Sequence, residues 1–134
     1  MELKFSANAG FFGMRRDRFT QYQPQRDLEE KIELVASVEG VTGVELKYPN
    51  DFADLKRVCE LLEKRDLQVS AVNVDIKDAE HFRHGALSAR SQTAREKVIG
   101  LLCEGMDLAA ELGTGLVTTC PLAARTTSYS RTST

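Results

Sequence analysis

Polar side chains that could bind a small molecule stand at the ends of several β-rich runs of the sequence. Asn8 closes the first run, Glu45 and Tyr48 lie in the second, and Asn73 and Asp75 alternate with valines in the third. If the runs are parallel strands, these ends meet at the sheet edge where α/β folds bind their ligands. The same argument adds further candidates next to these ends, namely Phe11, Phe12, Lys47, Thr119 and Cys120.

Glu45 is the most informative of these candidates, because a carboxylate inside an apolar strand must either face a polar interior or be paired. The pattern predicts that Glu45 lies in a ligand pocket. The structural alternative is an ion pair of Glu45 with Lys4 or Lys47. Asn73 and Asp75 share one face of their strand, which suits a pocket and a polar layer inside a barrel equally well.

A second group of ligand-type side chains, Asp78, Glu80, His81 and His84, lies in a polar segment after the third run. Two histidines three residues apart on a helix could share a metal ion. The segment offers no further ligand at a fixed spacing, so we expect a solvated surface and no metal site. We also assign no catalytic residue from the sequence.

The elements that must position these residues alternate between strand and helix patterns. β-rich runs predict strands at residues 3–9, 43–49, 68–76 and 116–121. Apolar residues at helical spacing predict helices that begin after Asp27, at Asp51 and near Thr93. Six residues of the last helix are expected to face inward: Val98, Leu101, Leu102, Met106, Leu108 and Ala109.

The predicted order βαβαβαβ implies parallel strands joined by right-handed crossovers. Two α/β architectures accept this order: an open doubly wound sheet, or part of a (β/α)8 barrel, whose complete form takes about 250 residues. Periodicity alone does not choose between them.

Composition excludes several classes of function. The chain has 134 residues, 42% of them hydrophobic, and a net charge of −2, which gives no field for gathering nucleic acid. We expect no membrane span and no secretory signal, and therefore a cytoplasmic protein. The cysteines Cys59, Cys103 and Cys120 are widely spaced and odd in number, so buried free thiols are expected.

Five segments of the chain form a recognisable set: FSANAGFFG, GVELKYP, AVNVDI, FRHGALSARSQTAREKVI and LAAELGTGLVTTCP. Together they resemble the xylose-isomerase-like TIM-barrel superfamily of sugar isomerases and sugar phosphate isomerase/epimerases. The most specific part is Phe82–Ile99, an HGAL turn followed by a helix with Arg95 and Lys97. The resemblance covers residues 1–122 and implies the N-terminal half of a TIM barrel, about four β/α units.

The resemblance also implies a chemistry. In that superfamily a divalent metal such as Mn or Mg holds adjacent sugar oxygens during aldose–ketose isomerisation or epimerisation. Its metal ligands belong to strands five to eight, so the resemblance gives this chain no metal ligand and no cofactor of its own. It implies part of a sugar or sugar phosphate pocket at Asn8, Glu45, Tyr48 and Asn73. We therefore expect a truncated isomerase/epimerase-like protein that is inactive alone.

Residues 123–134 differ from the rest of the chain, because they are rich in Ser and Thr and contain no acid. This composition predicts a disordered tail. Codons permitted from Arg125, in a shifted frame, encode a D-Y-x-x-F-Q segment similar to one in related isomerases. Our hypothesis is a frameshift near Leu122, which sequencing the downstream DNA would test.

Two other interpretations compete with a partial isomerase. A half barrel leaves its outer strands unpaired, which favours a non-catalytic module that forms a homo-oligomer through the exposed barrel edges. A small open α/β domain that binds a ligand by itself is the other alternative. The mass of the protein in solution separates these two.

Overall fold

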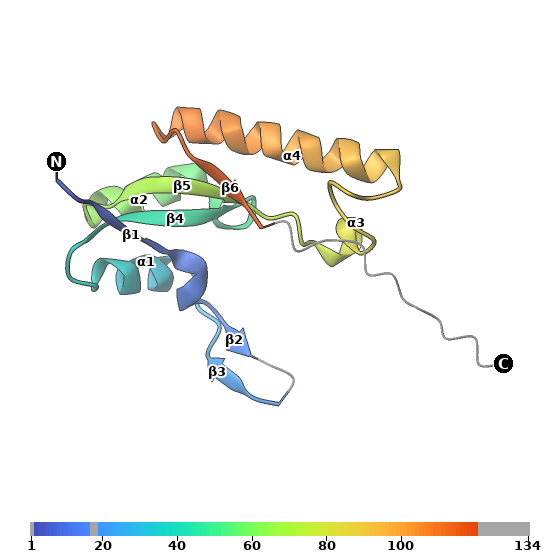
Figure 1. Ribbon diagram of the computed structural model, residues 1–134. Helices are drawn as coiled ribbons and strands as arrows, with labels where there is room; N and C mark the ends of the chain where they lie inside the picture. Colours follow the sequence, from blue (N-terminus) through green and yellow to red (C-terminus); the bar gives the residue numbers. More distant parts are fainter. Residues whose placement is uncertain (1, 17–18, 121–134) are drawn as a thin grey trace.

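The computed structural model describes residues 2–16 and 19–120 of the chain (Figure 1). The predicted tail 123–134 and the frameshift position near Leu122 lie outside the described residues. The strands are β1 (Phe5–Asn8), β2 (Arg15–Arg16), β3 (Gln21–Gln23), β4 (Val41–Tyr48), β5 (Gln68–Val74) and β6 (Val117–Thr119). The α-helices are α1 (Leu28–Ala36), α2 (Leu55–Lys64), α3 (Ala79–Phe82) and α4 (Gln92–Glu111), and the 3₁₀ turns are η1 (Ala9–Phe12) and η2 (Asn50–Phe52).

Four of the strands form one parallel sheet in the order β1-β4-β5-β6. In Figure 1 the sheet is curled like half of a barrel, with α1 below it and α4 above it along the same curved face. The predicted alternation of strands and helices, with parallel strands, is confirmed. A short antiparallel pair, β2-β3, stands apart from this sheet in the loop after β1, where no strand was predicted.

The helices cover a single face of the sheet. Val44 and Leu46 of β4 and Val72 of β5 are fully buried against side chains of α1, α2 and α4 in one apolar cluster. Val74 continues the same face into a second cluster with Val98 of α4. In the part of the chain that the structure describes, no helix covers the opposite face, so the sheet is not doubly wound.

The ends of α1 and α2 show how local sequence sets the elements. Asp27 caps α1, as the sequence predicts, and the structure adds a reciprocal capping box between Asp27 and Glu30. The second helix begins later than predicted, because Asp54 rather than Asp51 caps its first turn. The Asp51 carboxylate is used elsewhere: it lies buried, 2.6 Å from Lys31 Nζ, and accepts a hydrogen bond from Lys47 N.

Helix α4 packs closely on β5 at Gly105. A Cβ atom placed on Gly105 would come within 2.5 Å of Val74 Cγ2, so glycine allows the close approach. Val98, Leu108 and Ala109 share this buried face, but Met106 is 55% exposed, which makes the prediction for Met106 wrong. The reason is that α4 has two apolar faces, and the sheet covers only one.

The prediction of buried thiols is also wrong for two cysteines. Cys59 on α2 and Cys103 on α4 are exposed, and Cys120 is partly buried. Both exposed cysteines stand beside the buried stripe of an amphipathic helix rather than within it. Among the described residues, no helix combines the length and the hydropathy needed to cross a membrane.

Candidate functional site

A chain of hydrogen-bonded polar side chains crosses all four strands on the helix-free face of the sheet. Asn8 Nδ2 of β1 donates to Glu45 Oε1 of β4 at 2.6 Å, and Asn73 Nδ2 of β5 donates to the same oxygen at 3.0 Å. Asn73 Nδ2 also donates to Thr118 Oγ1 of β6 at 2.9 Å. We call Asn8, Glu45, Asn73 and Thr118 the polar ladder.

Strand register explains why these residues meet. Asn8 is paired with Glu45 and Asn73 with Thr118, so each pair stands side by side on neighbouring parallel strands. Glu45 and Asn73 lie two residues apart in the register of β4 and β5, because Glu45 pairs with Ala71. Alternate residues of a strand point to opposite faces, so Leu46 and Val72 enter the core while the ladder stays outside it.

The ladder satisfies Glu45 without a cation. Its carboxylate is partly buried, and two amide N–H groups offset the cost of removing it from water. The alternative of an ion pair with Lys4 or Lys47 is not observed, since Lys47 Nζ lies 3.7 Å from Asp75 Oδ2 instead. Lys47 and Asp75 follow Glu45 and Asn73 by two residues and form a second polar row nearer the strand ends.

Tyr48 lies apart from the other predicted pocket residues. Its hydroxyl donates to Glu104 Oε2 of α4 at 2.6 Å, on the helix-covered side of β4. This hydrogen bond and the nearby negative charge of Glu104 raise the pKa of the Tyr48 phenol. The structure thus brings together Asn8, Glu45 and Asn73 and separates them from Tyr48.

Thr118 is the member of the ladder that sequence reasoning did not select. The candidates from that run were Thr119, whose Oγ1 donates to Val74 O, and Cys120. The alternation of residues along a strand could have identified Thr118. Val117 packs on the apolar clusters, so Thr118, the next residue, faces the helix-free side of the sheet. Of the aromatic candidates after β1, Phe12 packs against the core. The Arg15 guanidinium lies over the ring of Phe11, 4.3 Å from the ring centre.

The ladder does not fit a divalent metal ion. Mg²⁺ and similar hard cations need several oxygen ligands. Here Glu45 is the only carboxylate of the ladder, and both asparagines turn N–H donors toward it. The arrangement instead suits a neutral ligand with hydroxyl groups, because a hydroxyl both donates and accepts hydrogen bonds.

The Asp78, Glu80 and His81 group lies on the loop and short helix after β5. One ligand atom from each lies within 4.8 Å of the others, and all three residues are exposed. Asp78 accepts hydrogen bonds from the His81 ring and from Glu80 N, which together lower the pKa of its carboxyl group. Through these contacts Asp78 caps α3. The expectation of a solvated surface without a metal ion stays a prediction.

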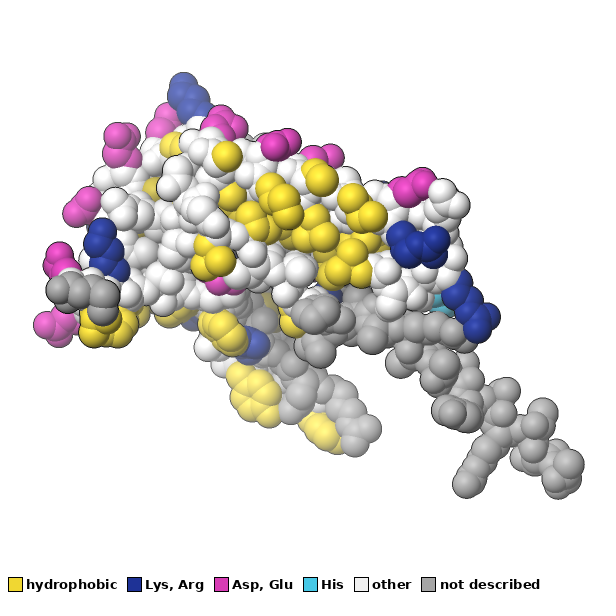
Figure 2. Space-filling view, turned by 45° about the horizontal axis from the view of Figure 1, so that its top comes forward, with side chains coloured by type: hydrophobic (Ala, Val, Ile, Leu, Met, Phe, Trp, Pro, Cys, Tyr) yellow, Lys and Arg dark blue, Asp and Glu magenta, His cyan; other side chains and the backbone are white. Residues whose placement is uncertain are grey.

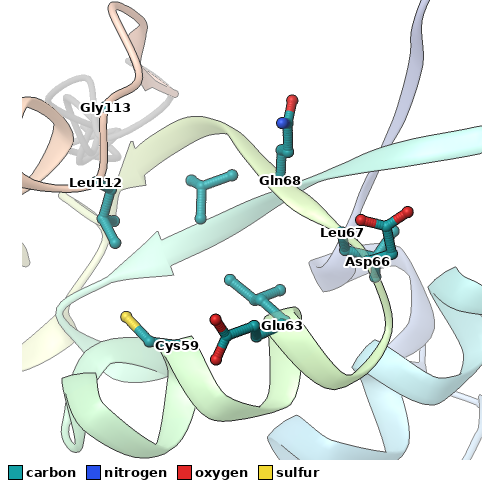
Figure 3. A pocket seen from close by; sticks show the side chains of 9 residues that line it. Cys59, Glu63, Asp66, Leu67, Gln68, Leu112 and Gly113 are labelled. Carbon is teal, nitrogen blue, oxygen red and sulfur yellow. The ribbon is translucent and has the colours of Figure 1, made fainter.

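Two hollows lie away from the polar ladder. One, of about 450 Å³, lies beside this cap and is lined by Asp75, Lys97 and Phe82 among others. The other, of about 500 Å³, lies between α2 and α4, where Figure 3 shows Cys59 and Glu63 of α2 on one side and Leu112 on the other. The second hollow is next to Gln68 at the start of β5, the end of the strands that usually serves stability rather than binding.

No protein-family model and no curated protein matches this chain.

Proposed function

We propose that this chain is the N-terminal half of a barrel of the sugar isomerase/epimerase type, and that its polar ladder forms one wall of a site for a polyhydroxylated small molecule. The observation that carries the proposal is the ladder itself. Its side chains come from every strand of the sheet and lie on the face that a closed barrel would turn inward.

The chemistry of the ladder supports a sugar or sugar phosphate as the ligand. Glu45 Oε2 and Asn73 Oδ1 take no part in the ladder hydrogen bonds and can accept from sugar hydroxyls. In the next row, Lys47 adds a hydrogen-bond donor and Asp75 an acceptor. Their contact with each other is long and partly exposed, so both groups can bind a ligand instead of each other. Because Asn8 and Asn73 both donate to Glu45 Oε1, the other carboxylate oxygen can accept a hydrogen bond from a sugar hydroxyl.

Binding can be tested by NMR titration of the full chain with D-xylose and with D-fructose. We expect shifts of the backbone amides of Asn8, Glu45, Asn73 and Thr118. Glu45→Gln should weaken binding about tenfold, because it replaces a charge-assisted hydrogen bond by a neutral one. Glu39→Gln makes the same change on an exposed loop and serves as the matched control. No shift at the ladder, or equal binding by Glu45→Gln, contradicts the proposal.

Turnover needs groups that this ladder does not provide. The family resemblance places the metal ligands on later strands, and the ladder itself does not suit a divalent cation. We therefore expect that residues 1–134 alone do not convert ketose to aldose with Mn²⁺ or Mg²⁺, as measured by a coupled sugar assay. Metal-dependent turnover that survives mutation of His81 and His84 would show that the ligand argument is wrong.

A second candidate function, a non-catalytic self-associating module, is favoured by the edges of the sheet. β1 and β6 are the outer strands, and residues at the β1 edge such as Leu3 and Phe5 are more than half exposed. Unpaired strand edges favour association. A monomer that binds sugar would instead favour the small open α/β ligand-binding domain.

A further inference from the structure

The hollow of about 450 Å³ lies at the end of the sheet where β4 and β5 finish. Pro49 and Asn50, which directly follow β4, form part of its wall. Ligands of parallel α/β folds bind at this end of the strands. We call this cavity the strand-end hollow. Its other lining residues include Asp75, Lys77, Asp78, His81, Phe82 and Lys97.

Asp75 connects the strand-end hollow to the polar ladder. It lines the hollow, and it also belongs to the second polar row, two residues after Asn73 of the ladder. Two residues of extended chain span about 7 Å. A pentose or hexose whose hydroxyls contact Asn73 therefore reaches Asp75, at the edge of the hollow, with the far end of its carbon chain.

Two lysines bring positive charge to the strand-end hollow, Lys77 from the loop after β5 and Lys97 from α4. Within the described part of the chain, neither ammonium group forms an ion pair. Figure 2 shows Lys or Arg side chains and a histidine at the end of the molecule where α4 begins. The His81 hydrogen bond lowers the pKa of the Asp78 carboxyl group and the charge of Lys97 lowers it further, so Lys97 faces the same space as Asp78.

The two carboxylates that line the strand-end hollow, Asp75 and Asp78, are held by other partners. Asp75 Oδ1 accepts a hydrogen bond from the backbone N–H of Lys77, and Asp75 Oδ2 lies 3.7 Å from Lys47 Nζ. Asp78 accepts hydrogen bonds from the His81 ring and from a backbone N–H. The two lysine side chains of the hollow are therefore left to bind an anion.

The acids nearest to the strand-end hollow do not line it. On α4, Glu96 accepts a hydrogen bond from a glutamine side chain, and Glu104 accepts one from the Tyr48 hydroxyl. Glu80 has a carboxylate oxygen within 4.8 Å of Asp78 but lies outside the wall of the hollow. An anion inside the hollow thus meets the lysines before it meets these acids.

We propose that the strand-end hollow binds the phosphate group of a phosphorylated sugar whose hydroxyls meet the polar ladder, with Lys77 and Lys97 as the phosphate ligands. A phosphate monoester carries about 1.5 to 2 negative charges at pH 7, and a lysine ammonium binds it as a compact positive charge. The buried side chain of Phe82 gives the hollow an apolar side, which reduces the screening of these charges by water. The inference rests on the proposed function and narrows its ligand to sugar phosphates.

NMR titrations of the full chain with D-fructose 6-phosphate and with D-fructose form a matched test. We expect the phosphorylated sugar to bind about tenfold more tightly. It should shift the backbone amides of Lys77 and Lys97 as well as those of the ladder, whereas inorganic phosphate alone should shift only those of the hollow. Equal affinity for the two sugars, with shifts confined to the ladder, overturns the inference and leaves the proposed function standing.

Removing both lysine charges tests the assignment of the phosphate ligands. The double variant Lys77→Gln/Lys97→Gln should lose the advantage of the phosphorylated sugar and bind D-fructose as before, which also shows that it folds. Lys56→Gln/Lys64→Gln removes the same charge from α2, away from the hollow, and should keep the advantage. An advantage that survives the loss of Lys77 and Lys97 overturns the inference. Shifts at the hollow with none at the ladder contradict the proposed function itself, and this inference with it.

Discussion

The two faces of strand β4 differ sharply although their residues alternate along one run of sequence. Val44 and Leu46 are fully buried under α1 and α2, whereas Glu45 between them joins the ladder and Lys47 is exposed. The apolar face is where burial stabilises the fold, at about 25 cal/mol per Å². The polar face contributes little of that kind, since hydrogen bonds to water are exchanged for hydrogen bonds within the ladder. The proposed function gives this polar face a role in binding rather than in stability.

The largest expected effect is on the covered face. Leu46→Ala removes a side chain that is 1% exposed and leaves a cavity between the sheet and its helices. We expect the free energy of unfolding to fall by about 2–5 kcal/mol. Urea denaturation measures it. A loss below 1 kcal/mol, on the order of a surface substitution, would mean that the helices cover this face only loosely.

The neighbouring substitution on the open face should behave differently. Glu45→Gln keeps an oxygen that can accept from both asparagines, so we expect a loss of less than about 1.5 kcal/mol. Removing one partner of a buried ion pair costs about 3–5 kcal/mol. A loss of that size in the same denaturation experiment would assign Glu45 to the core rather than to a binding face.

The contrast between the faces also explains what the sequence could predict. Alternation predicted the strands, and helical spacing with the cap at Asp27 predicted the helices, because both signals are local. Parallel pairing predicted that the strand ends carrying Asn8, Glu45 and Asn73 meet at one edge of the sheet, whereas the contact between their side chains is a finding of the structure. These predictions needed no knowledge of which helix packs where.

Other features depend on contacts between distant segments, which sequence periodicity does not contain. Asp51 looked like a helix cap, but its pairing with Lys31 requires α1 to lie beside the end of β4. Met106 looked like a core residue because α4 has more apolar residues than one face holds. Tyr48 looked like a pocket residue because it ends a strand, yet its place after Lys47 turns it toward α4.

Tyr48 gives the smallest effect and the sharpest comparison of the two faces. Tyr48→Phe removes one exposed hydrogen bond to Glu104, so we expect a loss of only about 0.5 kcal/mol at pH 7. It should leave sugar binding unchanged, because the phenol lies on the helix side, whereas Glu45→Gln should weaken binding. Reduced sugar binding by Tyr48→Phe would return Tyr48 to the site.

The pH dependence of this variant follows from the raised pKa of the Tyr48 phenol. Since the folded state holds the phenol proton more tightly than the unfolded chain does, the contribution of Tyr48 is complete below the unfolded pKa of about 10. It is lost as the pH rises through the higher folded value. The stability difference between wild type and Tyr48→Phe should therefore be constant from pH 7 to about 9 and shrink above about 10. Urea denaturation across this range measures the difference. The other titratable groups are the same in both proteins, so their contributions cancel. A difference that grows with pH would mean that Glu104 does not stabilise the neutral phenol of Tyr48.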